Sequence, residues 1–246
     1  MEAIHRREYT VSATDANSAG RLKNSRILAI MQQIAGEHSA LLGVDQASLD
    51  SKQLFWAVIR HRVQITRLPK SGETIRVCTW PMPTTRTAYP RATAAYDEKG
   101  QELFRGISLW VLMDMETRAM VLPGKSGVDV QGSLQGNELT LPGSLLPKEL
   151  ANTECRTVRF SDLDFNRHMN NCRYMEWVDD LLDADFHEAH CPKELLVCYL
   201  SEARESEKID IAWEVSQEDI LRVDAQRDET GLSAGHSRVF AAQVQF

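Results

Sequence analysis

The feature of this sequence that most limits its fold is an approximate internal repeat. A segment that begins at Asn24 has apolar residues at helical spacing, and a segment that begins at Asn171 has the same pattern. Both asparagines are predicted N-caps, because a side-chain oxygen there can accept a free backbone N–H. Further on, the turns and alternating strands at 72–77 and 206–211 resemble each other. Each half is therefore expected to contain one long helix followed by strands.

A third match strengthens the repeat. The sequences at 97–100 and 228–231 are both typical of hairpin turns, and the second precedes an alternating strand at 240–246. Three matches in the same order indicate an internal duplication. The interval from helix start to strand is 51 residues in the first half and 38 in the second. We therefore expect an insertion of about 13 residues in the first half, around 41–53.

The two halves are separated by a glycine-rich stretch. Residues 124–150 contain five of the 13 glycines in the chain, a composition typical of an extended connection. We therefore expect an N-terminal domain at 1–123, a linker at 124–150 and a C-terminal domain at 151–246. A single apolar helix followed by antiparallel strands favours a sheet wrapped around that helix. The predicted class is α+β, with two tandem hot-dog domains.

Composition excludes several kinds of protein. The net charge of −7 argues against general nucleic-acid binding, although one small basic patch could still meet an acidic partner. No apolar run is long enough for a membrane helix, and the N-terminus lacks the apolar core of a secretory signal. The five cysteines are odd in number and lack metal-ligand spacing, which favours reduced thiols. These observations predict a cytoplasmic protein that binds neither membrane nor nucleic acid.

The densest polar cluster of the chain lies at 161–171, immediately before the second helix. Asp164, Asn166 and His168 are spaced two residues apart, so an extended segment would point all three to one side. The helix N-terminus that follows offers N–H groups and positive dipole character, which could stabilise a carbonyl oxygen gaining charge. The same residue types are common as caps and turn formers, so a structural role stays open.

The segment 161–177 resembles the signature of the acyl-acyl-carrier-protein thioesterases of plants and bacteria. The first-half segments 56–60 and 108–114 also resemble strands of that family, and the resemblance extends from about Tyr9 to Phe246. It implies a thiolester hydrolase that cleaves a fatty acyl group from the phosphopantetheine arm of acyl carrier protein. The products would be free fatty acid and the carrier. The resemblance implies no metal or organic cofactor, and plant members carry a transit peptide that is absent here.

The resemblance also implies four catalytic residues. The family's proposed Asp-x-Asn-x-His motif falls on Asp164, Asn166 and His168, and a downstream glutamate falls on Glu202 by the match of its strand. A solvated charge at a strand end is the alternative for Glu202. An older cysteine mechanism is unavailable at its proposed position, because Ala203 occupies it. Either carboxylate could activate water, and the sequence does not decide between them.

The first half is expected to lack a working site of its own. In its lead-in at 14–24, we align Asp15 and Asn17 with the first two members of the motif and Ala19 with the histidine. Leu68 falls where the glutamate would be. Neither alanine nor leucine can move a proton, so one site per chain is predicted, built on the second half.

Several alternatives remain at this point. An acyl-CoA thioesterase on the same double hot-dog, a hot-dog dehydratase and a non-catalytic acyl-effector-binding protein would share much of the pattern. Arg60, Arg62 and Arg67 are candidates for a carrier-protein docking patch, and a solvated strand face is the alternative for them. Single hot-dog domains pair, so a fused pair could stay monomeric or form a homodimer. Acyl chain length cannot be read from the sequence.

Overall fold

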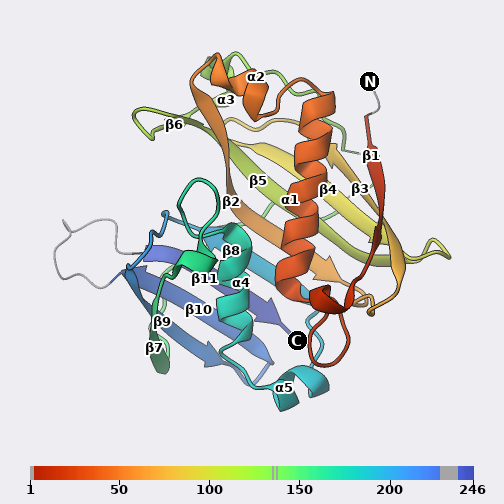
Figure 1. The fold of residues 1–246 in the computed structure, drawn as a ribbon, viewed down its shortest axis with the longest axis vertical. Coiled ribbons are helices and arrows are strands. Elements are labelled where there is room, and N and C mark those ends of the chain that lie inside the picture. Colours follow the sequence, from red (N-terminus) through yellow and green to blue (C-terminus); the bar gives the residue numbers. More distant parts are fainter. Residues whose placement is uncertain (1–2, 135, 137, 228–237) are drawn as a thin grey trace. The chain divides into compact units, whose positions relative to one another are not determined.

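The computed structural model describes residues 3–134, 136, 138–227 and 238–246 (Figure 1). The chain divides into two compact units, Met1–Pro142 and Gly143–Phe246. The hairpin turn predicted at 228–231 lies outside the described residues. In the part of the chain that is described, no helix combines the length and apolar character needed to span a bilayer.

Unit 1, Met1–Pro142, is an antiparallel sheet with one long helix against it. The sheet order is β1-β3-β4-β5-β2, and the short β6 pairs with β5. The elements are β1 (His5–Thr10), a short 3-10 helix (Ala13–Asp15), α1 (Asn24–Leu41), α2 (Gln46–Asp50), β2 (Leu54–Ile65), β3 (Thr74–Pro81), β4 (Tyr89–Tyr96), β5 (Glu102–Asp114), β6 (Met120–Val121) and α3 (Pro123–Ser126). The hairpin turn expected at 97–100 is confirmed, since it joins β4 to β5.

The core of unit 1 lies between α1 and the sheet. Ile27, Met31 and Ile34 recur at helical spacing on one face of α1 and are almost fully buried. Close packing is visible at Gly106 in β5, where an added Cβ would come within 2.8 Å of the Met31 side chain. Glycine at this position therefore lets the helix approach the sheet closely.

Unit 2, Gly143–Phe246, repeats this plan with shorter elements. Its sheet order is β8-β11-β10-β9-β7, and all pairs are antiparallel. The elements are β7 (Asn152–Thr157), a 3-10 helix (Phe160–Asp162), α4 (Asn171–Asp179), α5 (Ala184–Ala189), β8 (Glu194–Tyr199), β9 (Lys208–Val215), β10 (Ile220–Arg227) and β11 (Arg238–Gln245). The strand expected at 240–246 is thus present as β11.

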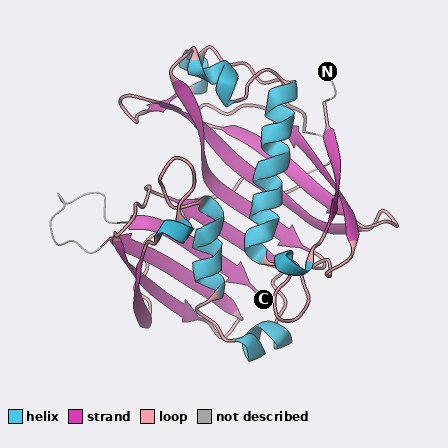
Figure 2. Cartoon of the chain, in the orientation of Figure 1, coloured by secondary structure: helices cyan, strands magenta, loops and turns pink. Residues whose placement is uncertain are grey.

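The helix of unit 2 packs on its sheet through aromatic side chains. Tyr174 and Trp177 of α4 are buried, and the Tyr174 ring meets those of Tyr199 and Phe240 at centroid distances of 5.6 and 5.0 Å. Figure 2 shows the same layout in both units, one principal helix against antiparallel strands. The predicted α+β class with two tandem hot-dog domains is confirmed.

The structure corrects the expected insertion at 41–53. The connection from α1 to β2 contains α2, and the corresponding connection in unit 2 contains α5 and is slightly longer. The extra length of the first half lies instead in α1, with 18 residues against 9 for α4, and in β2, with 12 against 6 for β8. The longer helix of unit 1 is thus accompanied by a longer strand.

The two helices begin where the sequence predicts, but their caps differ. Asn24 and Asn171 are the first helical residues, so the N-cap prediction is wrong for both by one position. Lys23 precedes α1 and makes no side-chain cap. In unit 2, Asn170 has extended backbone angles and its Oδ1 accepts the Cys172 N–H at 2.9 Å.

The connecting stretch packs on unit 1 through side chains that were candidates for carrier docking. Arg60 donates to the carbonyl oxygen of Pro142 at 3.4 Å, and Arg62 donates to the Thr140 hydroxyl. Arg67 pairs with Glu73 at 2.9 Å. Arg60 and Arg62 therefore bind the segment that ends at Pro142, and Arg67 binds a glutamate in the connection between β2 and β3.

Candidate active site

The polar motif lies on a tight hairpin loop between the 3-10 helix of unit 2 and α4 (Figure 1). Leu163 and Met169 form an isolated antiparallel bridge, and the Asp164 N–H donates to the His168 carbonyl at 2.9 Å. Arg167 closes the loop in the left-handed region, with φ 63°. The expectation of an extended segment with three side chains on one side is wrong, because the backbone reverses direction between Asp164 and His168.

The Asp164 carboxylate shapes this loop. Its Oδ1 accepts the Asn166 N–H at 2.8 Å and the His168 N–H at 3.4 Å. Aspartate commonly binds the backbone two residues ahead in this way, which stabilises a turn. One carboxylate oxygen is therefore already engaged with the backbone of the motif.

His168 and Glu202 form the central side-chain pair of the site. The His168 Nε2 lies 3.2 Å from the Glu202 Oε2, and their side chains are 18% and 42% exposed. Two backbone contacts hold the two loops together. His168 and Arg204 form an isolated antiparallel β-bridge, and the Met169 N–H donates to the Ala203 carbonyl at 2.8 Å. Glu202 lies in the connection after β8, just past the strand itself. The structure thus brings together two of the four predicted residues by direct contact.

Asn166 lies at the exposed tip of the loop. Its carboxamide makes no hydrogen bond with any described residue, including the His168–Glu202 pair. An exposed carboxamide can donate to a substrate carbonyl oxygen or to a water molecule. The geometry therefore leaves Asn166 available for substrate.

The N-terminus of α4 offers fewer N–H groups than the sequence suggests. The Cys172 N–H is taken by the Asn170 side chain, and the Arg173 N–H donates to the Asn170 carbonyl at 2.8 Å. The positive end of the helix dipole remains. These two N–H groups of the first helical turn are therefore not free to bind a substrate oxygen.

An ion pair beneath the loop was not anticipated from the sequence. Asp162 is buried, and its Oδ1 accepts the Arg173 Nε–H at 3.2 Å, while its Oδ2 accepts the Arg159 N–H at 2.8 Å. This joins the start of the loop to the first turn of α4. We call the contact between an aspartate of the 3-10 helix and an arginine of the following helix the Asp–Arg brace.

Unit 1 has the same brace between Asp15 and Arg26, at 2.7 Å. The repeated spacing of 11 residues was the signal that could have revealed it.

The cysteines near the motif are covered to different degrees. Ala203 is fully buried at the position of the older cysteine proposal. Cys198 is buried, with its Sγ 3.6 Å from the Gly143 carbonyl oxygen, and Cys172 is half-buried. Among the residues that the structure describes, no three His, Cys, Asp or Glu side chains form a group suited to a metal ion.

Unit 1 has a loop of the same construction before α1. Ala16 and Leu22 form the bridge, the Asn17 N–H donates to the Arg21 carbonyl at 2.8 Å, and Gly20 has φ 70°. Each of these interactions has an equivalent in the loop of unit 2. The two loops can therefore be aligned residue by residue from their hydrogen bonds.

This alignment corrects the one based on motif letters by two residues. Asn17 corresponds to Asp164 and Arg21 to His168, whereas Asp15 belongs to the brace. Ala19 therefore takes the place of the motif asparagine. Leu68 still corresponds to Glu202. The Leu22 N–H donates to the Pro69 carbonyl at 2.8 Å, as the Met169 N–H donates to the Ala203 carbonyl, and Leu68 and Glu202 directly precede these two acceptors.

Comparison with known proteins agrees with this arrangement. The family model "Acyl-ACP thioesterase N-terminal domain" matches residues 2–122, and "Acyl-ACP thioesterase C-terminal domain" matches 147–242. A chloroplastic palmitoyl-acyl carrier protein thioesterase of Gossypium hirsutum is 27% identical over 199 residues, 75% of this chain and 47% of that protein. The chain spans about half the length of the curated relatives that it matches.

Solved structures share the whole fold. A crystal structure of an acyl-ACP thioesterase from Bacteroides thetaiotaomicron superposes with a TM-score of 0.89 at 21% identity, covering 99% of this chain and 98% of that one. The 12:0-ACP thioesterase from Umbellularia californica gives a TM-score of 0.81 at 22% identity, with 100% and 97% coverage. With both family models matched in order along the sequence, this chain belongs to the acyl-ACP thioesterase family.

Proposed function

We propose that this protein hydrolyses fatty acyl thioesters carried by acyl carrier protein, releasing free fatty acid and the carrier thiol. The observation that carries the proposal is the His168–Glu202 pair, at 3.2 Å, held by two paired loops of unit 2. Membership of the family supports it, as do relatives named palmitoyl-acyl carrier protein thioesterase and dodecanoyl-[acyl-carrier-protein] hydrolase.

Glu202 is the better of the two carboxylates for activating water. Its side chain is 42% exposed, so water can reach it, and His168 holds one carboxylate oxygen. One oxygen of Asp164 is instead engaged by two N–H groups of its own loop. In the proposed reaction, Glu202 takes a proton from water as the water oxygen attacks the thioester carbonyl carbon.

His168 would complete the proton transfer. The new C–O bond forms first, and collapse of the tetrahedral intermediate breaks the C–S bond. The departing sulfur then takes a proton from His168, which recovers one from Glu202 through their direct contact. Atoms and charge balance, because one proton leaves water for Glu202, one reaches the carrier thiol from His168, and the transfer from Glu202 to His168 restores both side chains.

Asn166 would stabilise the oxygen on which negative charge develops. Its exposed carboxamide can donate to that oxygen, and the positive end of the α4 dipole lies next in the chain. The proposed division of labour is a base, a proton donor, an oxyanion donor and, in Asp164, a residue that shapes the loop.

The deciding experiment measures thiol release from a panel of acyl-carrier-protein substrates, with matched acyl-CoA substrates alongside. We expect kcat/KM to be at least tenfold higher on the carrier protein. Glu202→Gln should abolish most turnover on both. A preference for acyl-CoA would reassign the substrate, and normal turnover by Glu202→Gln would remove the proposed base.

A further inference from the structure

The hairpin loop that carries the polar motif exposes aromatic and cationic side chains. In the segment 159–167, both acidic residues are turned inward: Asp162 is buried in the brace and Asp164 is half-buried in the turn. The exposed residues include two phenylalanines, Phe160 at 82% and Phe165 at 92%. Arg159 and Arg167 are exposed beside them, so this face is cationic and aromatic.

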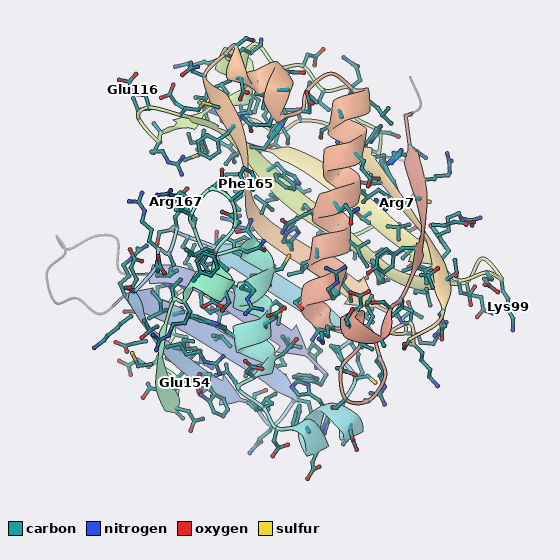
Figure 3. The ribbon with its side chains drawn as sticks, viewed as in Figure 1. Arg7, Lys99, Glu116, Glu154, Phe165 and Arg167 are labelled. Atoms are coloured by element: carbon teal, nitrogen blue, oxygen red, sulfur yellow. The ribbon has the colours of Figure 1, made fainter. Side chains whose placement is uncertain are left out.

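Arg159, Arg167 and the exposed Arg204, which bridges with His168, make no ion pair with any residue that the structure describes. Exposed Glu202 and Glu205 flank Arg204 in sequence, but the three arginines are not paired with them. Figure 3 shows Phe165 and Arg167 at the outer end of the loop before α4. We call Arg159, Phe160, Phe165, Arg167 and Arg204 the Arg–Phe face.

Arg167 occupies a backbone conformation that disfavours it. Its φ is 63°, and its structural counterpart in unit 1 is Gly20, with φ 70°. Glycine adopts this region freely, whereas a residue with a Cβ is strained there. An arginine at such a position costs some stability relative to glycine.

The matching loop of unit 1 serves as an internal reference. By the hydrogen-bond alignment, Ala13, Ser18 and Gly20 stand where unit 2 has Phe160, Phe165 and Arg167. The same backbone therefore forms without the two aromatic side chains and with glycine in place of Arg167, although Arg21 and Lys70 are cationic at the positions of His168 and Arg204. The Arg–Phe face is not needed to fold the loop, and it occurs on the loop that holds His168.

From these observations we propose that the Arg–Phe face is the docking surface for the acidic carrier protein that presents the acyl thioester. The proposal rests on the function proposed above. The chain has a net charge of −7, so an acidic partner meets repulsion over much of the surface and needs a local cationic region. Arginine and aromatic side chains are the residues that most often dominate binding at protein interfaces.

The test compares two matched variants, Arg167→Gly and Arg118→Gly. Arg118 is also exposed, also has positive φ, at 56°, and lies in unit 1 on a turn distant in sequence from the motif. Both substitutions remove one charge and relieve one strained backbone position, and Arg118→Gly also removes the contact of its guanidinium with the Phe55 ring at 4.4 Å. KM and kcat are measured on an acyl carrier protein substrate, on acyl-CoA and on an acyl-N-acetylcysteamine thioester.

We expect Arg167→Gly to raise KM for the acyl carrier protein at least fivefold more than for the other two thioesters, and Phe165→Ala to do the same. Added salt should weaken the wild-type interaction and reduce the difference from Arg167→Gly. Arg118→Gly should match wild type on every substrate. Thermal unfolding checks that the variants are folded.

Four results would overturn the proposal. Equal KM changes on all three substrates would give Arg167 a role at the thioester itself, and equal changes on the carrier protein and acyl-CoA would indicate phosphate binding. Unchanged KM with lost binding to anionic vesicles would indicate a membrane contact. Unchanged KM with an altered sedimentation coefficient would indicate self-association. Failure of the proposed function is distinguishable, because wild type itself would then release no thiol from the carrier-bound thioester, whatever it does with the small one.

Discussion

The loop before α1 and the loop before α4 share a backbone but differ in side chains. Each has a bridge across its base, a left-handed residue at its end and an Asp–Arg brace to the following helix. Unit 1 places Arg21 where unit 2 has His168, and Leu68 where it has Glu202. The comparison separates the device that folds the loop from the groups that could perform chemistry on it.

The largest expected difference concerns the proton-transfer pair. Glu202→Gln and His168→Ala should each lower kcat by about 10²–10⁴, the range typical of general acid–base catalysis. Arg21→Ala, at the position of His168 in unit 1, should change kcat by less than twofold. Turnover assays of purified variants with matched thermal unfolding curves decide this. A comparable loss from Arg21→Ala would mean that unit 1 also participates in catalysis.

The next difference concerns Asn166 and Asn17, the asparagines that the motif letters align but the hydrogen bonds do not. Asn166→Ala should reduce kcat by about 10², as expected for removal of an oxyanion donor. In unit 1, Asn17 accepts the N–H groups of Ala19 and Arg21 at 3.1 Å, so its role is to shape the turn. Asn17→Ala should therefore lower kcat by less than tenfold while lowering stability. Equal losses of kcat in two folded variants would imply two working sites.

The Asp–Arg brace should contribute a similar amount to the free energy of unfolding in both units. Asp15→Asn and Asp162→Asn should each lower the free energy of unfolding by about 1–3 kcal/mol, since each leaves a partly buried arginine without its carboxylate. Urea denaturation measures the change. A loss confined to one of the two variants would show that the shared geometry does not mean shared energetics.

The brace in unit 1 also predicts a pH dependence. Burial raises the pKa of Asp15, but hydrogen bonds from Ser12 and Tyr9 and the charge of Arg26 outweigh it and lower the pKa below its ordinary 3.8. The stabilisation is therefore complete above pH 3.8 and is lost as the pH falls through the lowered folded value. Asp15→Asn should remove this acid-dependent loss. If the Asp15→Asn variant loses stability at low pH in the same way as wild type, other groups cause that loss.

The smallest effect is expected at the second residue of each helix, which is Ser25 in unit 1 and Cys172 in unit 2. Cys172→Ser makes unit 2 resemble unit 1 and should leave kcat within about twofold, because Ala203 excludes the older cysteine arrangement. Thiol alkylation should likewise spare most activity. Complete inactivation that substrate prevents would instead make Cys172 or Cys198 essential.

The fold was predictable because short-range sequence patterns indicate its helices, turns and strands. Helical spacing after Asn24 and Asn171, turn residues at 97–100 and strand alternation near the C-terminus each depend on neighbouring residues only. The position of the extra length was not predictable, since both connections between helix and strand contain a short helix. A longer α1 and a longer β2 give no local signal that marks them as the difference.

The site was predictable in its residues but not in its geometry. The family resemblance supplied His168 and Glu202, and the structure places them in contact. Residue spacing could not reveal the reversal between Asp164 and His168, because it depends on a left-handed residue and on hydrogen bonds to the Asp164 carboxylate. The same ambiguity produced the two-residue error in unit 1, where Asp-x-Asn recurs by coincidence of the brace and the turn.

The path of the chain after α3 has a practical consequence for dissecting the protein. Val128 is buried beside Leu49 and Leu112, Leu139 packs against the cluster around Trp80, and a Cβ at Gly132 would lie 2.2 Å from the backbone of Met82. A fragment ending at 123 would lose this cover and leave apolar side chains open to aggregation. Recombinant expression of the first unit by itself should therefore extend to Pro142.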